Sequence, residues 1–122
     1  MAKIVIVDSS TFMRGALKFI VEHAGNEVVG GTDTGLKGLE LCTGLKPDIM
    51  IIEISLKEGM DGIDTIKELK RVNERILNVV TFAPGEENLV EQAKAAGASG
   101  QIAKPFLAKD VAEELGRILK KR

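Results

Sequence analysis

Short apolar runs alternate five times with longer stretches in which apolar residues recur at helical spacing. The runs predict strands at residues 3–7, 27–31, 48–54, 77–82 and 100–103. The longer stretches predict helices at about residues 11–24, 35–45, 86–96 and 107–120, with one more that Asp61 caps. This alternation implies right-handed crossovers and a parallel sheet. We therefore predict an α/β fold, a doubly wound five-stranded parallel sheet of order 2-1-3-4-5 in a three-layer sandwich with five helices.

Helical spacing also predicts which side of each helix is buried. In the first helix the apolar stripe runs through Phe12, Ala16, Phe19, Ile20 and then His23 or Ala24. The second helix carries Leu36, Leu39 and Leu41. Ser9 or Ser10 can cap the first helix, and Gly25 can supply the left-handed residue that ends it.

Four of the predicted strands end on polar residues that could do chemistry: Asp8, Glu53, Thr81 and Lys104. In an open α/β sheet the carboxyl ends of the strands share the edge that forms the binding site. Two carboxylates there make a hard oxygen site suited to Mg²⁺, and a lysine and a hydroxyl can contact a phosphoryl group. The same residues also allow a simpler interpretation, in which Lys104 pairs with Asp8 or Glu53 to balance their charge.

Composition narrows the possible functions. The net charge of −1 gives no basic footprint for nucleic acid. The four Phe are the only aromatics, too few to stack bases or a flavin ring. The length of 122 residues predicts one domain. The basic end, Lys120-Lys121-Arg122, is interpreted as a complement to the last helix dipole.

The single cysteine, Cys42, is interpreted as a small core residue, and its isolation excludes an internal disulfide. No segment has the pattern of a signal peptide or the length of a membrane span. We therefore expect a cytoplasmic protein with no membrane partner and no direct nucleic-acid partner.

Three weaker patterns favour structural interpretations. Residues 30–37 nearly match a phosphate loop, but Leu36 follows the second glycine where the motif requires lysine. Residues 8–11 open a helix and could hold a phosphate as flavodoxins do, although the loop lacks glycines. His23 lies at the wrong end of its helix for a catalytic triad and is interpreted as a surface or boundary histidine. A flavodoxin-like domain that binds a small ligand remains a remote alternative.

Several motifs occur together in the order and spacing of one family. They are Ile4-Val5-Ile6-Val7-Asp8-Ser9-Ser10 with Met13-Arg14, Asp33-Thr34-Gly35, Pro47-Asp48-Ile49, Met60-Asp61-Gly62, Val80-Thr81, Gly97-Ala98-Ser99-Gly100 and Ala103-Lys104-Pro105-Phe106. By these motifs the whole chain resembles a response-regulator receiver domain of two-component signalling and phosphorelays. Within that family it resembles the single-domain chemotaxis type. The resemblance implies a flavodoxin-like fold over residues 1–122, with no output domain.

The resemblance also implies roles for individual residues. In the family an aspartate at the end of the third strand accepts a phosphoryl group from a histidine kinase, and Glu53 holds that position here. The other carried-over roles are the acidic pocket (Asp8, Ser9), the phosphoryl contacts (Thr81, Lys104) and the Mg²⁺ ligands (Asp8, Glu53 and the backbone carbonyl of Ser55). The Lys104–Pro105 bond is expected to be cis.

The chain departs from the family pattern at several of these positions. Glu53 replaces the acceptor aspartate, and a carboxylate misplaced by about 1 Å costs roughly 100-fold in a positioned reaction. Ser9 replaces one acid of the pair, so we expect weak Mg²⁺ binding. Phe82 stands where alanine or glycine is usual and could obstruct a phosphodonor, and Gln101 stands where an aromatic often moves inward. The loop after Glu53 is longer than usual, and Lys57 replaces a common proline.

Together these departures favour a pseudo-receiver, which is not an enzyme and acts as a phosphorylation-independent interaction module. Glu53 would partly mimic the activated state, fixing the surface of residues 86–96, 100–103 and 107–120 for a protein partner. A histidine kinase is one candidate partner. The alternative is a working phosphoryl acceptor that uses Mg²⁺, the only cofactor that the residues suggest.

Overall fold

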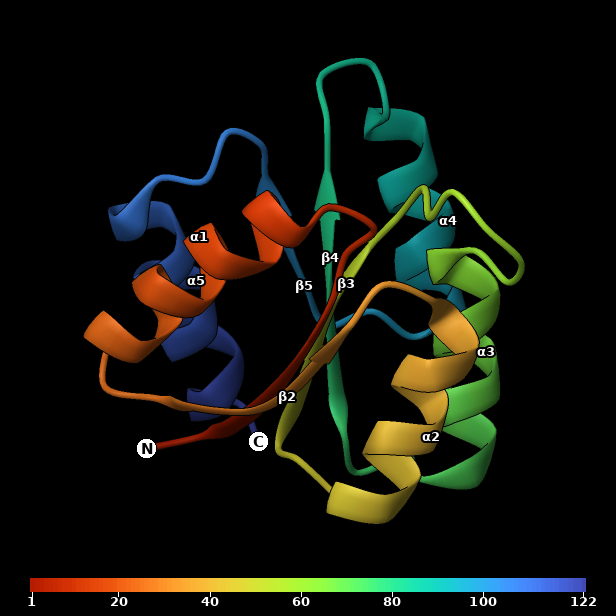
Figure 1. Cartoon of the computed structure of the whole chain (residues 1–122), viewed down its shortest axis with the longest axis horizontal. Helices are drawn as coiled ribbons and strands as arrows, with labels where there is room; N and C mark the ends of the chain where they lie inside the picture. The colour runs from red at the N-terminus through yellow and green to blue at the C-terminus, as the bar shows by residue number, and fades with distance from the viewer.

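Five parallel strands form the centre of the structure, in the order β2-β1-β3-β4-β5 (Figure 1). The computed structural model describes all residues, 1–122. The strands are β1 (Lys3–Val7), β2 (Glu27–Thr32), β3 (Ile49–Glu53), β4 (Leu77–Phe82) and β5 (Gly100–Ala103). The predicted strand order and the parallel pairing are both confirmed.

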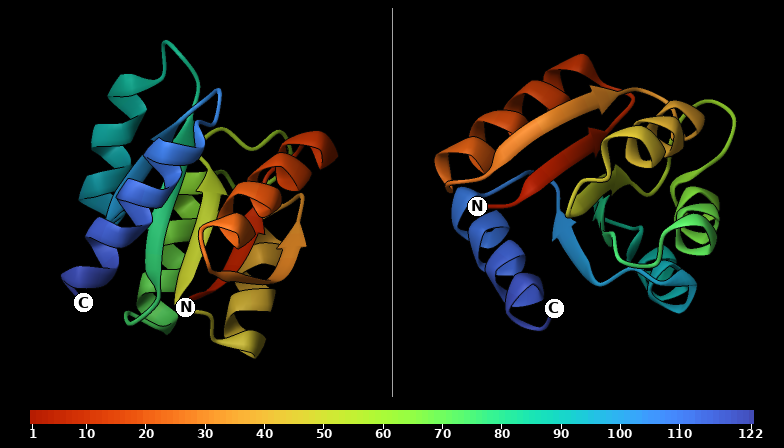
Figure 2. Two further views of the ribbon diagram at one scale, coloured as in Figure 1. Left: turned by 90° about the vertical axis from the view of Figure 1, so that its left-hand side faces the viewer. Right: turned by 90° about the horizontal axis from the view of Figure 1, so that it is seen from below.

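Helices cover both faces of this sheet and complete the three layers (Figure 2). They are α1 (Thr11–His23), α2 (Gly35–Leu45), α3 (Gly62–Val72), α4 (Glu87–Ala96) and α5 (Ala108–Lys120). Helices α1 and α5 lie on one face, and α2, α3 and α4 lie on the other. None of these helices is both long and apolar enough to cross a membrane.

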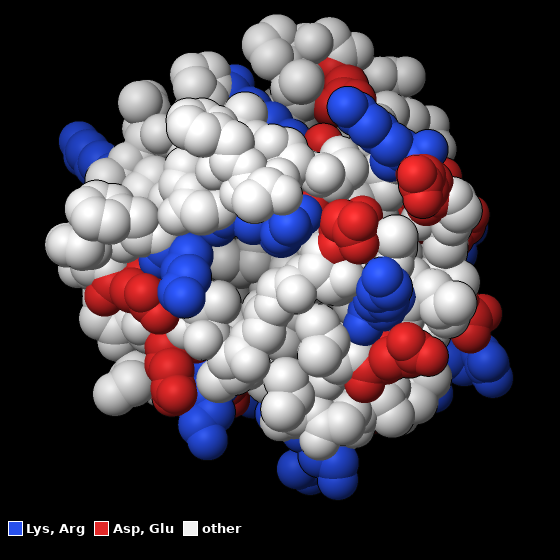
Figure 3. Space-filling model, viewed as in Figure 1, with Lys and Arg blue, Asp and Glu red and all other residues white.

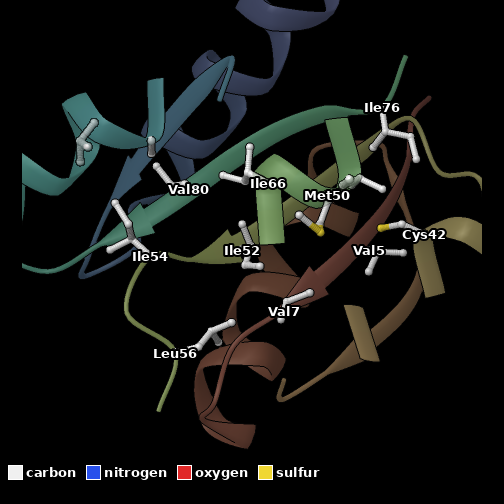
Figure 4. Close-up of a cluster of buried hydrophobic side chains, with 13 residues drawn as sticks. Val5, Val7, Cys42, Met50, Ile52, Ile54, Leu56, Ile66, Ile76 and Val80 are labelled. Carbon is white, nitrogen blue, oxygen red and sulfur yellow. The ribbon is translucent and has the colours of Figure 1, made fainter. Parts of the chain in front are cut away.

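Each face of the sheet has its own hydrophobic core, because β1 and β3 are buried on both sides. The core under α2, α3 and α4 contains 13 buried residues, among them Val5, Cys42 and Ile52 (Figure 4). The core under α1 and α5 contains 12, among them Ile4 and Leu115. Cys42 is a core residue as predicted, and burial raises the pKa of its thiol to about 12.

The predicted buried face of α1 is partly wrong, although Ile20 does pack against the core under this helix. Phe12 and Phe19 are exposed, at 79% and 63% of their surface, whereas Leu17 and Val21 are buried against the sheet. The helix carries apolar residues on two sides, and the aliphatic pair one turn apart packs on the core. His23 stacks on Phe19, with ring centroids 3.9 Å apart, so it is a surface histidine as interpreted.

The predicted stripe of α2 is also partly wrong, because Leu36 is 56% exposed. Small residues face the sheet instead: Gly35, Gly38 and Cys42 are the buried positions of this helix. A Cβ on Gly38 would meet Val7 Cγ2 at 2.6 Å, so only glycine allows the helix to approach this closely. Periodicity cannot reveal such a contact, since it counts apolar side chains and glycine has none.

Helix ends follow the predicted chemistry. Ser10, one of the two candidate caps, accepts a hydrogen bond from the Met13 amide at 3.2 Å. Asp61 caps α3 by accepting from the Asp64 amide at 2.8 Å. Gly25 follows α1 with a φ of 91°, a conformation that favours glycine. These caps determine where the loops that carry the polar residues begin.

Candidate functional site

The sheet brings the four predicted polar residues to one edge. Asp8 directly follows β1, and Glu53 is the last residue of β3, paired in register with Thr81 of β4. Lys104 follows β5, and its amide donates to the Phe82 carbonyl at 2.8 Å. The Lys104–Pro105 bond is cis, as expected. Parallel pairing therefore gathers two carboxylates, a hydroxyl and an ammonium at the carboxyl ends of the strands.

Lys104 is the centre of this site and contacts both acids. Its Nζ donates to Glu53 Oε2 at 2.9 Å and forms an ion pair with Asp8 Oδ2 at 3.2 Å. Burial alone would lower the pKa of Lys104, but the hydrogen bond that it donates to Glu53 and the charge of Asp8 outweigh burial and raise that pKa. The lysine is therefore a fixed internal cation between the two carboxylates.

Ser9 holds the other oxygen of Glu53. Its amide and its hydroxyl both donate to Glu53 Oε1, at 3.0 Å and 2.8 Å. Burial would raise the pKa of Glu53, but the bonds from Ser9 and Lys104 outweigh it and lower that pKa. A residue that the resemblance placed in an acidic pair thus acts here as a hydrogen-bond donor to the acid across the pocket.

Thr81 contributes a hydroxyl that has no partner. The residue is buried, with 1% of its surface exposed, and its Oγ1 makes no hydrogen bond. Buried polar atoms are normally paired, and exceptions often mark functional positions. Thr81 lies opposite Glu53 in the β3–β4 pair. Of the residues predicted to contact a phosphoryl group, it is the one whose side chain has no partner.

The predicted Mg²⁺ ligands do not fit the ion as they are arranged. Both oxygens of Glu53 are occupied by donors, Asp8 Oδ1 accepts from the Ser10 amide at 2.8 Å, and Asp8 Oδ2 faces Lys104. No three acidic, histidine or cysteine side chains are grouped to hold a metal. The hydroxyl of Ser55 donates to Glu86 at 2.6 Å, and the role of the Ser55 backbone carbonyl as a ligand stays a prediction. Mg²⁺ would compete with the ammonium of Lys104 for Glu53 Oε2 and Asp8 Oδ2.

Phe82 and Gln101 line a hollow that neither carboxylate borders. Phe82 packs against the core under α4, and the hollow, of about 830 Å³, lies between α4, β5 and α5. Gln101 Oε1 is buried without a partner. The structure therefore associates these two residues with the α4–β5–α5 surface, and obstruction of a phosphodonor by Phe82 stays a prediction.

Sequence reasoning did not predict the contacts of two residues, Arg14 and Glu86, that organise the loops around the site. Arg14 Nη1 donates to the Asp8 carbonyl at 2.6 Å, which links α1 to the loop after β1. Glu86 accepts from Ser55 Oγ at 2.6 Å and from the Ala83 amide at 2.8 Å. Ser55 and Glu86 follow the neighbouring strands β3 and β4. These positions were the signal in the sequence that could have predicted their contact.

Comparison with known proteins decides the family. Residues 4–116 match the family described as the response regulator receiver domain. The chain is 39% identical over 118 residues to the chemotaxis protein CheY of Thermotoga maritima, which covers 97% of this chain and 98% of that protein. It belongs to the response-regulator receiver family.

Further relatives agree with this assignment. CheY of Bacillus subtilis is 35% identical over 117 residues, covering 96% of this chain and 97% of that protein. Among solved structures, the response regulator domain of Thermotoga maritima CheB superposes with a TM-score of 0.80 at 29% identity, covering 97% and 93% of the two chains. This receiver domain therefore belongs to two-component signalling, where such domains interact with kinases and other proteins.

Proposed function

We propose that this receiver domain acts as a protein-interaction module whose state does not depend on phosphorylation. The observation that carries the proposal is that both carboxylate oxygens of Glu53 already accept hydrogen bonds within the protein. Its carboxylate accepts from the amide and hydroxyl of Ser9 and from the ammonium of Lys104, so each oxygen is already engaged. A carboxylate held in this way is a poor nucleophile toward a phosphodonor, because attack would break charge-assisted hydrogen bonds.

The same contacts support partial mimicry of a phosphorylated state. The extra methylene of Glu53 carries a negative charge toward Lys104, the residue to which the family resemblance assigns a phosphoryl contact. In this proposal the ion pair holds Lys104 and the end of β5 where a phosphoryl group would otherwise hold them. No enzymatic activity is part of the proposed role.

The proposed partner surface is formed by α4, β5 and α5. It contains the hollow of about 830 Å³, whose lining includes Phe82, Asp110, Glu113 and Arg117. Lys104 connects this surface to the carboxylates, since it directly follows β5. A histidine kinase or another signalling protein is the kind of partner that the family favours.

The direct test is incubation with acetyl phosphate and Mg²⁺ followed by intact-mass measurement. We expect no phosphoryl adduct on the wild type. The double variant Glu53→Asp, Ser9→Asp restores an aspartate and a second acid, and we expect it to gain one phosphoryl mass. An adduct on the wild type that disappears in Glu53→Gln would overturn the proposal.

Mimicry of the phosphorylated state needs a separate test, because it concerns the conformation of the α4–β5–α5 surface and not the transfer of a phosphoryl group. Glu53→Gln keeps the size of the side chain and removes its charge, so the ion pair with Lys104 is lost. We expect faster amide hydrogen exchange in α4 and β5 and weaker binding of any partner on this face. Unchanged exchange in both elements would show that Glu53 does not hold the surface.

One observation favours the second candidate, a working phosphoryl acceptor. The Thr81 hydroxyl is buried and free, which suits a group that waits for a phosphoryl oxygen. The same mass measurement separates the candidates, and Thr81→Val refines it. If the wild type gains a phosphoryl group and Thr81→Val gains it more slowly, the second candidate is correct.

A further inference from the structure

The two edge strands of the sheet differ in whether side chains bond to their outward backbone groups. At the β5 edge, side chains of α5 bond to the backbone: Glu114 Oε2 accepts from the Gln101 amide at 2.7 Å, and Arg117 donates to the Ser99 carbonyl at 3.0 Å. At the β2 edge no side chain bonds to the backbone of residues 27–32. Unpaired backbone groups at a sheet edge are a template for another strand. The edge of β2 is therefore open while that of β5 is occupied.

The backbone groups that point outward from β2 can be identified. The Asp8 amide donates to the Thr32 carbonyl at 3.1 Å, so Thr32 faces β1. Successive residues of a strand direct their backbone groups to opposite sides, and Gly31 therefore directs its amide and carbonyl away from the sheet. Gly31 also has no side chain to hinder an approaching chain. This position is the natural point of contact for an added strand.

On the α1 side, the open edge is bordered by a basic hollow. Its volume is about 440 Å³, and its lining includes Arg14, Lys18 and Gly31 but no acidic residue. Lys18 is exposed and makes no hydrogen bond or ion pair, so its charge is free for a partner. In the space-filling view, basic side chains border a recess where α1 and β2 meet (Figure 3).

On the α2 side, the same edge is bordered by an apolar hollow of about 600 Å³, which also reaches Gly31. Leu41 and Leu45 form its apolar part, and Leu45 is 47% exposed. Lys37 and Glu40 lie in the same lining and offset each other in charge. The two faces of the β2 edge thus offer opposite chemistry, basic toward α1 and apolar toward α2.

We propose that the β2 edge binds an extended segment of a partner protein in which acidic residues alternate with apolar ones. Side chains of a strand point alternately to the two faces of a sheet. A segment added beside β2 would place its acidic residues near Arg14 and Lys18, and its apolar residues near Leu41 and Leu45. Main-chain hydrogen bonds supply affinity in this mode, and the flanking side chains supply specificity.

A second copy of the chain fits this edge less well. The segment that would pair is β2 itself, Glu27–Thr32, which has one acid followed by valines, glycines and a threonine. It cannot supply the alternating charge that the basic hollow favours. The proposed site lies at the opposite edge of the sheet from β5, away from the α4–β5–α5 surface.

The test uses a fluorescent, end-capped peptide of seven residues in which glutamate alternates with leucine or valine, measured by fluorescence anisotropy against the full chain. We expect saturable binding that weakens with added salt, with amide exchange slowed at Gly31 and its neighbours. Lys18→Glu should weaken binding by at least about fivefold, since an attractive surface pair becomes a repulsive one. Lys67→Glu, at an exposed lysine on α3, makes the same charge change elsewhere and should leave binding within about twofold.

A second peptide and a second variant test the alternation and the backbone contact separately. A peptide of the same composition with its glutamates clustered should bind more weakly, because alternation is lost. Gly31→Pro removes the outward amide, and edge strands tolerate proline where no ladder bond is lost. It should abolish binding, and circular dichroism checks that it folds. Equal effects of Lys18→Glu and Lys67→Glu, protection outside β2, concentration-dependent dimers in place of peptide binding, or no binding would overturn the proposal.

Discussion

Glu53 carries its carboxylate one methylene further from the backbone than an aspartate would, and this reach brings it to Ser9 and Lys104. Its pKa is lowered from the ordinary value of 4.5, so the ionised form stabilises the fold above that pH, and the benefit is lost as pH falls through the folded value. We expect Glu53→Gln to be less stable at pH 7 by about 1–2 kcal/mol in urea denaturation, since charged hydrogen bonds are lost. Near pH 3 the difference should shrink.

The control for that measurement is Glu91→Gln. Glu91 lies on α4 and pairs with Lys94 at 3.4 Å, but both side chains are largely exposed. Exposed pairs contribute little, so this variant should change stability by less than about 0.5 kcal/mol at either pH. A Glu53→Gln variant that behaves like Glu91→Gln would show that the pocket ion pair adds no stability.

Asn78 is fully buried in β4, and both polar atoms of its side chain lack hydrogen-bond partners. An unsatisfied buried amide costs about 1–3 kcal/mol. We expect Asn78→Val to raise the free energy of unfolding by an amount in this range, since valine is close in size and suits a strand. Thermal and urea denaturation measure the gain, and a loss of stability would show that the amide has a partner in solution.

At the scale of elements, Glu86 links two loops that carry the site. It accepts from Ser55 in the loop after β3 and from Ala83 in the loop after β4, directly before α4 begins. Glu86→Ala should speed amide exchange through residues 83–90 and lower stability by about 1 kcal/mol. Ser55→Ala should show a smaller effect of the same kind, while Glu91→Ala on the exposed side of α4 should show none. Unchanged exchange in Glu86→Ala would mean that the loops are not coupled.

The elements themselves were largely predictable from sequence, and the reason is local. Continuous apolar runs indicate buried parallel strands, and residues such as Ser10 and Asp61 cap helices through their own side chains. The face of α1 was not predictable by spacing, because Phe12 and Leu17 both fit a helical stripe and only packing selects between them. Likewise the sequence placed Glu53 and Lys104 together, but not the bonds from Ser9 that hold the acid.

At the scale of the whole molecule, tight backbone approaches join the site to the core. A Cβ on Gly62, the first residue of α3, would meet the Glu53 carbonyl oxygen and the Ile54 Cα, the latter at 2.9 Å. The start of α3 therefore lies directly against the end of β3. This contact fixes where α3 begins relative to the end of β3, whatever the course of the loop between them.

Cys42 offers a measure of whether the whole fold opens as one unit. It is fully buried in the core under α2, α3 and α4, and with a pKa of about 12 only about one thiol in ten thousand would be ionised at pH 8. Since domains of this size are stable by about 5–15 kcal/mol, labelling by iodoacetamide should be slowed by at least roughly a thousandfold relative to a cysteine peptide. The labelling rate should rise with urea in step with unfolding followed by circular dichroism. A rate that is fast and independent of urea would show that α2 opens locally, and the two faces of the sheet would then not be held by a single cooperative structure.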